Sequence, residues 1–204
     1  PLSPVLFSLV MTQVFREVEV VWHRRGYGTN VGQSLTNKRL THVAFADDMT
    51  LIARSWTSLK RMVAMVREAL LKRGLCLHPS KCKAQTNRAD WSMRGSLPIL
   101  PDFSLDVLLD GQCLDVLGAR LSMEDPTKAE IANRMAIGWR KFWALKRLLL
   151  NKKVSVKKRM RLFDSTVGNS VLYGTHAWTP REDELRKMRT TQDRMMRKTC
   201  AKPR

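Results

Sequence analysis

The chain has 204 residues, 44% of them hydrophobic, which is enough for one well-packed domain or a domain with a small appendage. Its 37 lysines and arginines outnumber 18 aspartates and glutamates, and the formal net charge of +19 makes a polyanion the expected partner, with nucleic acid ahead of an anionic membrane surface. No apolar run approaches the roughly 18 residues that a membrane-spanning helix needs. A basic membrane-surface or scaffold protein is the least favoured alternative and no membrane partner is expected, because the basic residues are not confined to one face of an amphipathic helix.

The chain is predicted to begin with a helix over about residues 4–22. Ser3 provides a capping hydroxyl and Pro4 suits the first helical position, after which apolar residues recur at three- and four-residue steps. Glycines in "GYGTNVG" end this pattern. The following stretch, "RLTHVAFADDMTLIA", consists of two runs rich in Val, Phe, Ile and Thr that meet at Asp47 and Asp48. It predicts a hairpin with the two acids at its tip.

A second helix is predicted after Ser55 or Ser58, with its exit at Gly74. "GLCLHPSKCKAQT" is typical of a short strand, a proline turn and a second extended piece, and residues 87–104 are expected to form an irregular insert. The stretch "LDVLLDGQCLDVLGARLS" then predicts a hairpin, because Asp110 and Gly111 lie between two alternating runs.

The pattern becomes helical after Ser122. Asp125 and Pro126 predict the start of a helix that runs towards Leu150, and Ser155 predicts the start of another. A third is expected at "TPRE", with Thr179 as its cap and Glu182 completing a capping box. The expected fold class is therefore α+β over residues 1–122, followed by an all-helical, strongly basic region over residues 123–204.

The adjacent aspartates need an explanation, because two neighbouring carboxylates within an apolar segment repel each other and are costly to bury. At the tip of a hairpin they would stay in water while the strands hold them rigidly, which suits a divalent metal ion. Hard oxygen ligands favour Mg²⁺, and phosphoryl-transfer enzymes use two such ions. The alternative interpretation is that Asp-Asp is a common turn dipeptide and both side chains are simply solvated.

Four further blocks accompany "AFADD" in order along the chain: "PLSPVLF" before it, then "GLCLHPSKCK", "LDVLGARLS" and "VLYGTHAW…RMMRK" after it. Together they resemble the reverse transcriptases of non-LTR (LINE-type) retrotransposons and group II introns. The resemblance implies a partial right-hand polymerase palm over residues 1–122, with a primer-grip-like hairpin at about 105–122, and a thumb-like region over residues 123–204. It also implies RNA-directed DNA polymerisation on an RNA template and a DNA primer.

The resemblance assigns roles to individual residues of this chain. It makes Asp47 a catalytic metal ligand with Asp48 as its supporting partner, and Lys81 a candidate general acid near the pyrophosphate leaving group. Leu117 and Gly118 would approach the primer backbone. The residues that would lie beside the template base and the incoming nucleotide are Pro1, Leu2, Ser3 and Pro4. Without the resemblance, Lys81 would be interpreted as a solvated surface lysine and the Leu117–Gly118 pair as an ordinary strand with a bulge.

The sequence also departs from the family pattern. His78, Cys82 and Val116 stand where the family has Asn, Thr and an aromatic residue. The family holds its metals with three aspartates, and the first precedes the block in which this sequence opens on Pro1. A truncated fragment, inactive alone, is therefore expected, and Mg²⁺ (or Mn²⁺) is expected only together with the missing third aspartate.

The helical region carries an unbroken basic run from Trp139 to Arg161. We expect it to contact nucleic-acid phosphates without reading sequence, and the residues assigned to this role are Arg140, Lys141, Lys146, Arg147, Lys152 and Lys153. Trp139 and Phe142 follow helical spacing with Leu145 and Leu149, which favours core positions over base stacking.

Two hypotheses about function follow from the sequence. The first is a polymerase fragment that uses deoxynucleoside triphosphates within the full-length protein. The alternative is a non-catalytic nucleic-acid-binding remnant of such an element, which would use only its charge. The four scattered cysteines predict reduced thiols in an intracellular protein, nuclear or cytoplasmic.

Overall fold

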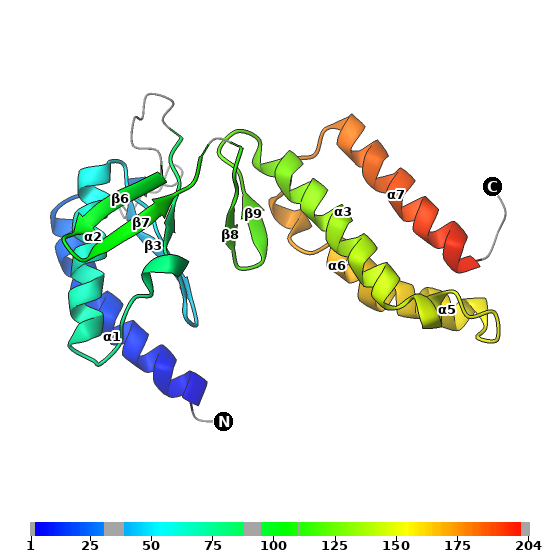
Figure 1. The fold of residues 1–204 in the computed structure, drawn as a ribbon, viewed down its shortest axis with the longest axis horizontal. Helices are drawn as coiled ribbons and strands as arrows, with labels where there is room; N and C mark the ends of the chain where they lie inside the picture. The colour runs from blue at the N-terminus through cyan, green and yellow to red at the C-terminus, as the bar shows by residue number, and fades with distance from the viewer. Residues whose placement is uncertain (1–2, 31–38, 88–94, 110, 201–204) are drawn as a thin grey trace. The chain divides into compact units, whose positions relative to one another are not determined.

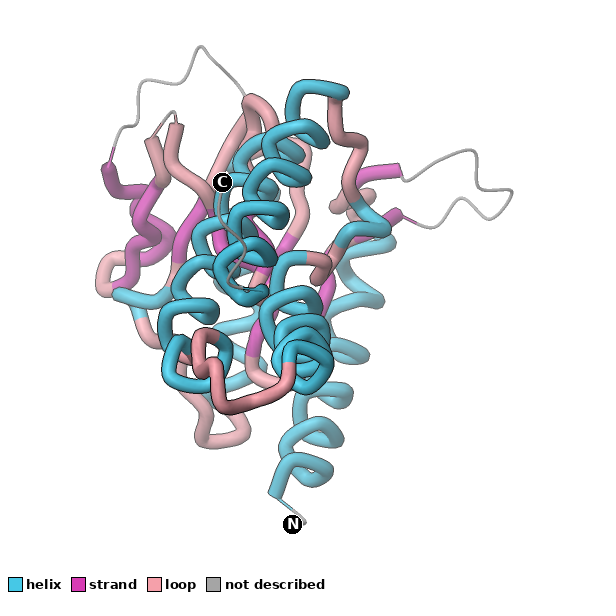
Figure 2. The backbone as a smooth tube through the Cα atoms, turned by 90° about the vertical axis from the view of Figure 1, so that its right-hand side faces the viewer, coloured by secondary structure: helices cyan, strands magenta, loops and turns pink. Residues whose placement is uncertain are grey.

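The computed structural model describes residues 3–30, 39–87, 95–109 and 111–200, and the chain forms two compact units, Pro1–Leu117 and Gly118–Arg204 (Figure 1). The first unit combines helices with small sheets, and the second consists mainly of helices. Figure 2 shows the helices, strands and loops along the backbone. The α+β fold class expected from the sequence is confirmed. The division falls between Leu117 and Gly118, whereas the sequence analysis set the change of character after Ser122.

The first helix, α1 (Ser3–Arg24), forms because its apolar residues line one side of the helix. Val14 and Trp22 are completely buried, whereas Leu6 and Leu9 near its start are each 57% exposed. The predicted helix over residues 4–22 is thus confirmed to within two residues at its C-terminal end.

Four short strands follow, in two antiparallel pairs. β1 (Thr29–Asn30) pairs with β2 (Arg39–Leu40), and β3 (His42–Phe45) pairs with β4 (Asp48–Leu51). The second pair is the predicted hairpin with the two aspartates at its tip, and this prediction is confirmed.

The second helix, α2 (Trp56–Leu71), starts at a hydroxyl cap, because the backbone N–H of Ser58 donates to Oγ of Ser55 at 3.2 Å. It ends in the double hydrogen-bond pattern that glycine favours: the N–H of Leu75 donates to the carbonyl of Leu70, and that of Gly74 to the carbonyl of Leu71, both at 3.0 Å. Gly74 takes a φ of 72° to allow it. Both predicted ends of this helix are confirmed.

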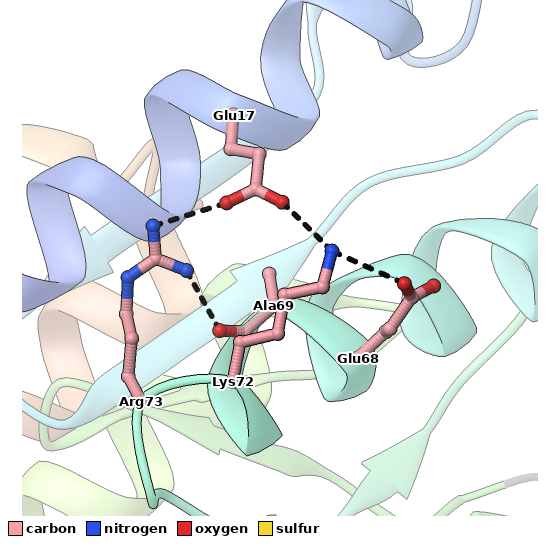
Figure 3. A network of polar contacts seen from close by, with 5 residues as sticks. All are labelled: Glu17, Glu68, Ala69, Lys72 and Arg73. Atoms are coloured by element: carbon pink, nitrogen blue, oxygen red, sulfur yellow. Dashed lines mark hydrogen bonds and ion pairs between the residues drawn. The ribbon is translucent and has the colours of Figure 1, made fainter.

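Helices α1 and α2 pack together on a common core that also receives partly buried side chains from β4. A polar network joins the same two helices at the surface (Figure 3). Glu17 of α1 accepts from Lys72 Nζ at 3.3 Å and from Arg73 Nη2 at 3.0 Å, while Lys72 also contacts Glu68 within its own helix at 3.2 Å. The network links α1 to the two residues that follow α2, beside the core that supports the aspartate hairpin.

The segment after α2 differs from the sequence expectations. Its first piece forms no strand; a single helical turn, η1 (Pro79–Lys81), follows. Next comes a three-stranded sheet in the order β5 (Lys83–Ala84), β7 (Phe103–Val107), β6 (Gly95–Leu100), with β5 parallel and β6 antiparallel to β7. The expected irregular insert over residues 87–104 is therefore wrong for its described part, since Leu97 and Phe103 are core residues.

The expected hairpin around Asp110 and Gly111 is also wrong. Its first run, β7, pairs with β6, which the sequence analysis had treated as insert. Its second run is itself a hairpin, formed by β8 (Leu114–Val116) and β9 (Ala119–Leu121). Asp110 itself lies outside the described residues. The first run pairs differently because the apolar face of β7 is buried in the core that β6 and α2 share, which depends on tertiary packing.

The helical unit contains α3 (Pro126–Ala144), α4 (Lys146–Leu149), α5 (Val156–Phe163), a widened turn η2 (Asp164–Gly168), α6 (Asn169–Val171), a short turn η3 (Thr175–Ala177) and α7 (Glu182–Cys200). Its core consists of Phe142, Leu149, Phe163, Val167 and Met195. The predicted helix starts at Asp125–Pro126 and at Ser155 are confirmed.

The start of α7 corrects a sequence expectation. Thr179 and Pro180 lie before the helix, and the capping interaction is made by Glu184, whose Oε2 accepts from the backbone N–H of Arg181 at 2.8 Å. The capping box is therefore displaced by two residues from the predicted Thr179–Glu182 pair. Among the described residues, no helix combines the length and the apolar character needed to cross a membrane.

The α1–α2 network makes stability depend on pH. Hydrogen bonds from Arg73 and then Lys72 hold the pKa of Glu17 below its ordinary value of 4.5. A group with a lowered pKa in the folded state stabilises that state above its unfolded pKa, and the contribution disappears as pH falls through the folded value. We expect Glu17→Gln to lower the urea midpoint of the chain at pH 7, and the difference from wild type to shrink as pH falls below the ordinary glutamate value of 4.5.

The matched control for this experiment is Glu68→Gln. Glu68 contacts Lys72 of its own helix, so its removal leaves the link between α1 and α2 in place. A midpoint for Glu17→Gln equal to that of Glu68→Gln at pH 7 would show that the network does not join the helices.

Candidate functional site

The aspartate hairpin closes with a turn of two residues, Ala46 and Asp47. Phe45 and Asp48 lie opposite each other on the strands, so Asp47 is in the turn and Asp48 is the first residue of β4. Ala46 has a φ of 52°, in the left-handed region that residues with a Cβ atom disfavour. Both aspartates are exposed. The turn therefore holds two neighbouring carboxylates in water on a backbone with little freedom.

The base of the hairpin is anchored in the core of the first unit. Met49 and Leu51 of β4 pack against the α1–α2 core, and the imidazole of His42 stacks on Phe15 with ring centroids 4.0 Å apart. His42 Nδ1 is 3.6 Å from Glu19 Oε1, but burial outweighs this partner and lowers the pKa of His42. The hairpin is thus fixed at its base and hydrated at its tip.

Asp47 and Asp48 offer two neighbouring carboxylates, and the described residues bring no further acidic, histidine or cysteine side chain close enough to complete a metal site. Within the part of the chain that the structure describes, no side-chain hydrogen bond or ion pair engages Asp47 or Asp48, and no three His, Cys, Asp or Glu side chains are grouped closely enough to hold a metal ion. Exposed carboxylate oxygens are the donors that Mg²⁺ and Mn²⁺ prefer. The donor type fits such an ion, and further oxygen ligands would be needed to hold one tightly.

Lys81 is the last residue of η1 and is exposed. Its backbone N–H donates to the carbonyl of His78 at 3.0 Å, and Ser80 Oγ lies 3.0 Å from Nδ1 of the same histidine. The turn is continued by Cys82, whose half-buried thiol has its pKa raised by burial. Among the described residues, no ion pair joins Lys81 to either aspartate. The backbone of Lys81 is therefore held in a hydrogen-bonded turn, and its side chain is exposed.

Leu117 and Gly118 form the turn of the β8–β9 hairpin. Their φ values of 50° and 78° are both in the left-handed region, as a tight two-residue hairpin turn requires. Among the described residues, and apart from Gly118 and its two chain neighbours, no atom lies within 4 Å of the position that a Cβ would occupy at Gly118. The backbone of this turn is therefore open to close approach by another molecule.

The start of the second hairpin strand is held by two buried charged residues of α3. Glu130 Oε2 accepts from the backbone N–H of Arg120 at 2.6 Å, and its Oε1 accepts from Arg134 Nε at 2.5 Å. Arg134 Nη2 also donates to the carbonyl of Gly118, and its guanidinium lies over the ring of Tyr173 at 4.5 Å. Both charged residues are 5% exposed or less. They connect α3 directly to the Leu117–Gly118 turn.

The basic residues assigned to nucleic-acid contact are all exposed. They lie on α3, on α4 and in the loop that follows, and they are Arg140, Lys141, Lys146, Arg147, Lys152 and Lys153. One arginine of the same run behaves differently: Arg159 is only 4% exposed and donates to the backbone carbonyls of Val154 and Thr199. Its charge holds helix ends together instead of facing solvent.

The remaining candidate residues divide into described and undescribed positions. Ser3 and Pro4 are exposed at the start of α1, where the carbonyl of Pro4 accepts from Ser8 Oγ at 2.9 Å. Pro1 and Leu2 lie outside the described residues.

The aromatic residues interleaved with the basic run differ in burial. Phe142 is completely buried, which agrees with the core position that its helical spacing favours. Trp143 is 46% exposed, with Lys198 Nζ 5.6 Å from its ring centroid.

Sequence reasoning missed Glu130 and Arg134. A helical projection could have found them, because Arg134 lies at three- and four-residue steps from Ile131, Gly138 and Phe142, all buried. Charged residues on the apolar side of a helix indicate a specific buried interaction, since an unpaired charge there would be costly.

Comparison with known proteins gives consistent matches. The model of the family described as reverse transcriptase (RNA-dependent DNA polymerase) matches residues 1–121. An uncharacterized transposon-derived protein of Caenorhabditis elegans is 29% identical over 149 residues, which are 71% of this chain and 51% of that protein. No solved structure matches the chain.

Two Pol polyproteins are similar over a shorter region of 82 residues, which is 40% of this chain and 7% of each polyprotein. The retrovirus-related Pol polyprotein from the type-1 retrotransposable element R2 of Nasonia vitripennis is 30% identical there, and that from the type-2 element R2DM of Drosophila melanogaster is 35% identical. This chain therefore spans about half the length, or far less, of the curated relatives that it matches.

The geometry of the second turn gives a stability prediction. Gly118→Ala would place a Cβ at a φ of 78°, which costs about 1–2 kcal/mol without a steric clash. As a control, Gly168→Ala lies in a helical segment with ordinary contacts and should be neutral or stabilising. Urea unfolding of the chain checks both changes, and an equal midpoint for the two variants would argue against a strained turn.

Proposed function

Because this chain belongs to the reverse transcriptase (RNA-dependent DNA polymerase) family, we propose that it forms the later part of the palm, and the thumb, of an RNA-directed DNA polymerase from a non-LTR retrotransposon. The observation that carries the proposal is the position of Asp47 and Asp48: two exposed acids on a rigid two-residue turn, inside the region that the family model matches. In the full-length protein the partners would be an RNA template, a DNA primer and deoxynucleoside triphosphates.

Asp47 and Asp48 would act as oxygen ligands for Mg²⁺ or Mn²⁺, together with a third aspartate from the full-length protein. Bound there, the metal would lower the barrier to attack by the primer hydroxyl and neutralise charge on the phosphates. The role of this chain is to hold both carboxylates at fixed positions: the anchored base of the hairpin and its restricted turn support such preorganisation. Lys81 would donate a proton to the leaving pyrophosphate.

The helical unit would bind the template–primer duplex. Its six exposed basic residues over 140–153 supply positive charge without any acid in the same run, which supports contacts to phosphates that do not depend on sequence. The Leu117–Gly118 turn, with open space beside the glycine, would approach the backbone of the primer end, and Ser3 and Pro4, next to Pro1 and Leu2, would border the nucleotide site.

The catalytic assignment is tested by Asp47→Asn in the full-length protein. Removal of one carboxylate charge should reduce primer extension by at least about 10²-fold, because the metal ion is held and neutralised less well. Binding to an RNA–DNA template–primer should stay within about 3-fold of wild type, since phosphate contacts carry it. Extension is followed on gels and binding by fluorescence anisotropy.

The matched control is Asp106→Asn, which changes an exposed aspartate of β7 in the same unit. It should extend primers like wild type. Full activity of Asp47→Asn would refute the metal-ligand role. Loss of binding in Asp47→Asn alone would mean that the hairpin is structural. Binding by the wild-type protein without any extension would favour a non-catalytic nucleic-acid-binding protein.

The phosphate-binding assignment is tested by the double variant Lys152→Ala/Lys153→Ala. Removing one lysine–phosphate pairing should reduce the slope of log affinity against log salt by a little under one, so the double variant should have a slope smaller by about 1 to 2. The control is Lys128→Ala/Lys187→Ala, which removes two exposed lysines outside the basic run. Equal slopes for the two double variants would place the nucleic acid elsewhere on the chain.

A further inference from the structure

We propose that Glu130 and Arg134 are positioning residues: they hold the Leu117–Gly118 turn in the orientation in which it would meet the primer end. This inference rests on the proposed polymerase function, in which that turn approaches the primer. It adds two residues of α3 that lie outside both the aspartate pair and the basic run.

The contacts of the two side chains are directed at the hairpin backbone. Arg134 donates to the carbonyl of Gly118, a turn residue, and Glu130 accepts from the N–H of Arg120, two residues further on. The Nε–Oε1 contact between the pair keeps both side chains in one arrangement. One planar guanidinium thus reaches the turn and its carboxylate partner at once, which a lysine ammonium on a flexible stem cannot reproduce.

The turn needs such support. Leu117 is held at a φ of 50°, where a residue with a branched side chain is rarely found, and such strain persists only when surrounding structure over-determines it. The hydrogen bonds from α3 to the carbonyl of Gly118 and to the N–H of Arg120 supply restraint of this kind, while a Cβ position at Gly118 has no described atom within 4 Å beyond its chain neighbours. The same open space leaves the turn accessible to a nucleic-acid backbone.

Burial of this pair is hard to explain by stability alone. A buried ion pair contributes little net stability compared with apolar residues of the same volume, because both charges must give up their water. The pair instead orients the hairpin backbone. The Glu130 carboxylate and the Arg134 guanidinium each bind one backbone group of the hairpin, and the ring of Tyr173 lies against the guanidinium. The arrangement ties the turn to α3, so a primer end bound by the turn would follow the helical unit.

The decisive experiment compares Arg134→Lys with Arg159→Lys in the full-length protein. Both arginines are buried to a similar degree in the helical unit and donate to backbone carbonyls, but only Arg134 contacts the hairpin. Arg134→Lys should leave template–primer affinity within about 3-fold of wild type and lower the single-turnover extension rate by about 10-fold or more, because a misplacement of about 1 Å can cost 10² in rate. Arg159→Lys should lower thermal stability without slowing extension.

A second pair of variants decides the matter if Arg134→Lys does not fold. Tyr173 is 51% exposed, so its replacement should be tolerated. Tyr173→Leu removes the ring that faces the guanidinium and should slow extension several-fold, whereas Tyr173→Phe keeps the ring and should restore the wild-type rate. Equal rates for the two would overturn the inference.

The outcomes separate this inference from the function on which it rests. If wild-type protein extends primers, Asp47→Asn does not, and Arg134→Lys extends as fast as Arg159→Lys, the polymerase proposal stands and the positioning role is refuted. If the wild-type protein does not extend primers at all, the proposed function fails and the positioning role fails with it. Slower extension by Arg134→Lys at unchanged affinity supports both.

Discussion

The restricted geometry of two-residue turns is the constraint on which both candidate sites depend. A two-residue hairpin turn of type I′ or II′ places at least one of its residues in the left-handed region of φ. In this chain Ala46 and Leu117 adopt that conformation, although neither is glycine. They are the only non-glycine residues with positive φ in the described part of the chain. These two unusual backbone conformations lie in the turn beside the aspartates and in the turn of the proposed primer contact.

Each turn is held by a different kind of support. The aspartate hairpin relies on apolar packing, in which β4 side chains and the stacked His42 anchor its base to α1 and α2. The second hairpin relies on directed hydrogen bonds from Glu130 and Arg134. Apolar packing suits a tip that must stay hydrated and charged, whereas hydrogen bonds to the backbone fix a turn whose own surface must stay open.

The excess of basic residues serves two purposes in this chain. Exposed lysines and arginines over residues 140–153 give the surface charge that favours a polyanion. Arg134 and Arg159 are buried and donate to backbone carbonyls of segments distant in sequence. The formal net charge therefore overstates the positive charge at the surface that could contact nucleic acid. Only the fold distinguishes the exposed basic residues from the buried arginines.

Local signals determined much of this structure. The first two helices, the ends of the second and the aspartate hairpin follow from periodicity, Ser55, Gly74 and the acidic pair, because these are short-range effects that the neighbouring residues settle. The resemblance to the family rests on a different feature of the sequence, the order of five motif blocks along the chain. Turn propensity also predicted a hairpin at Asp110 and Gly111. That prediction failed, because β7 pairs with β6, which precedes it in the chain.

Strand pairing and buried charge were decided by tertiary structure. The pairing of β7 with β6 and β5 depends on which apolar face reaches the core beside α2, and one sequence does not encode that contact locally. The Glu130–Arg134 pair likewise reaches the hairpin backbone only when α3 packs beside β9. The sequence by itself determined the first two helices, the starts of two helices in the second unit and the acidic tip, because these depend on neighbouring residues. The tertiary structure decided the strand pairing and which backbone groups Glu130 and Arg134 hold, because burial and hydrogen bonding between distant segments exist only in the folded chain.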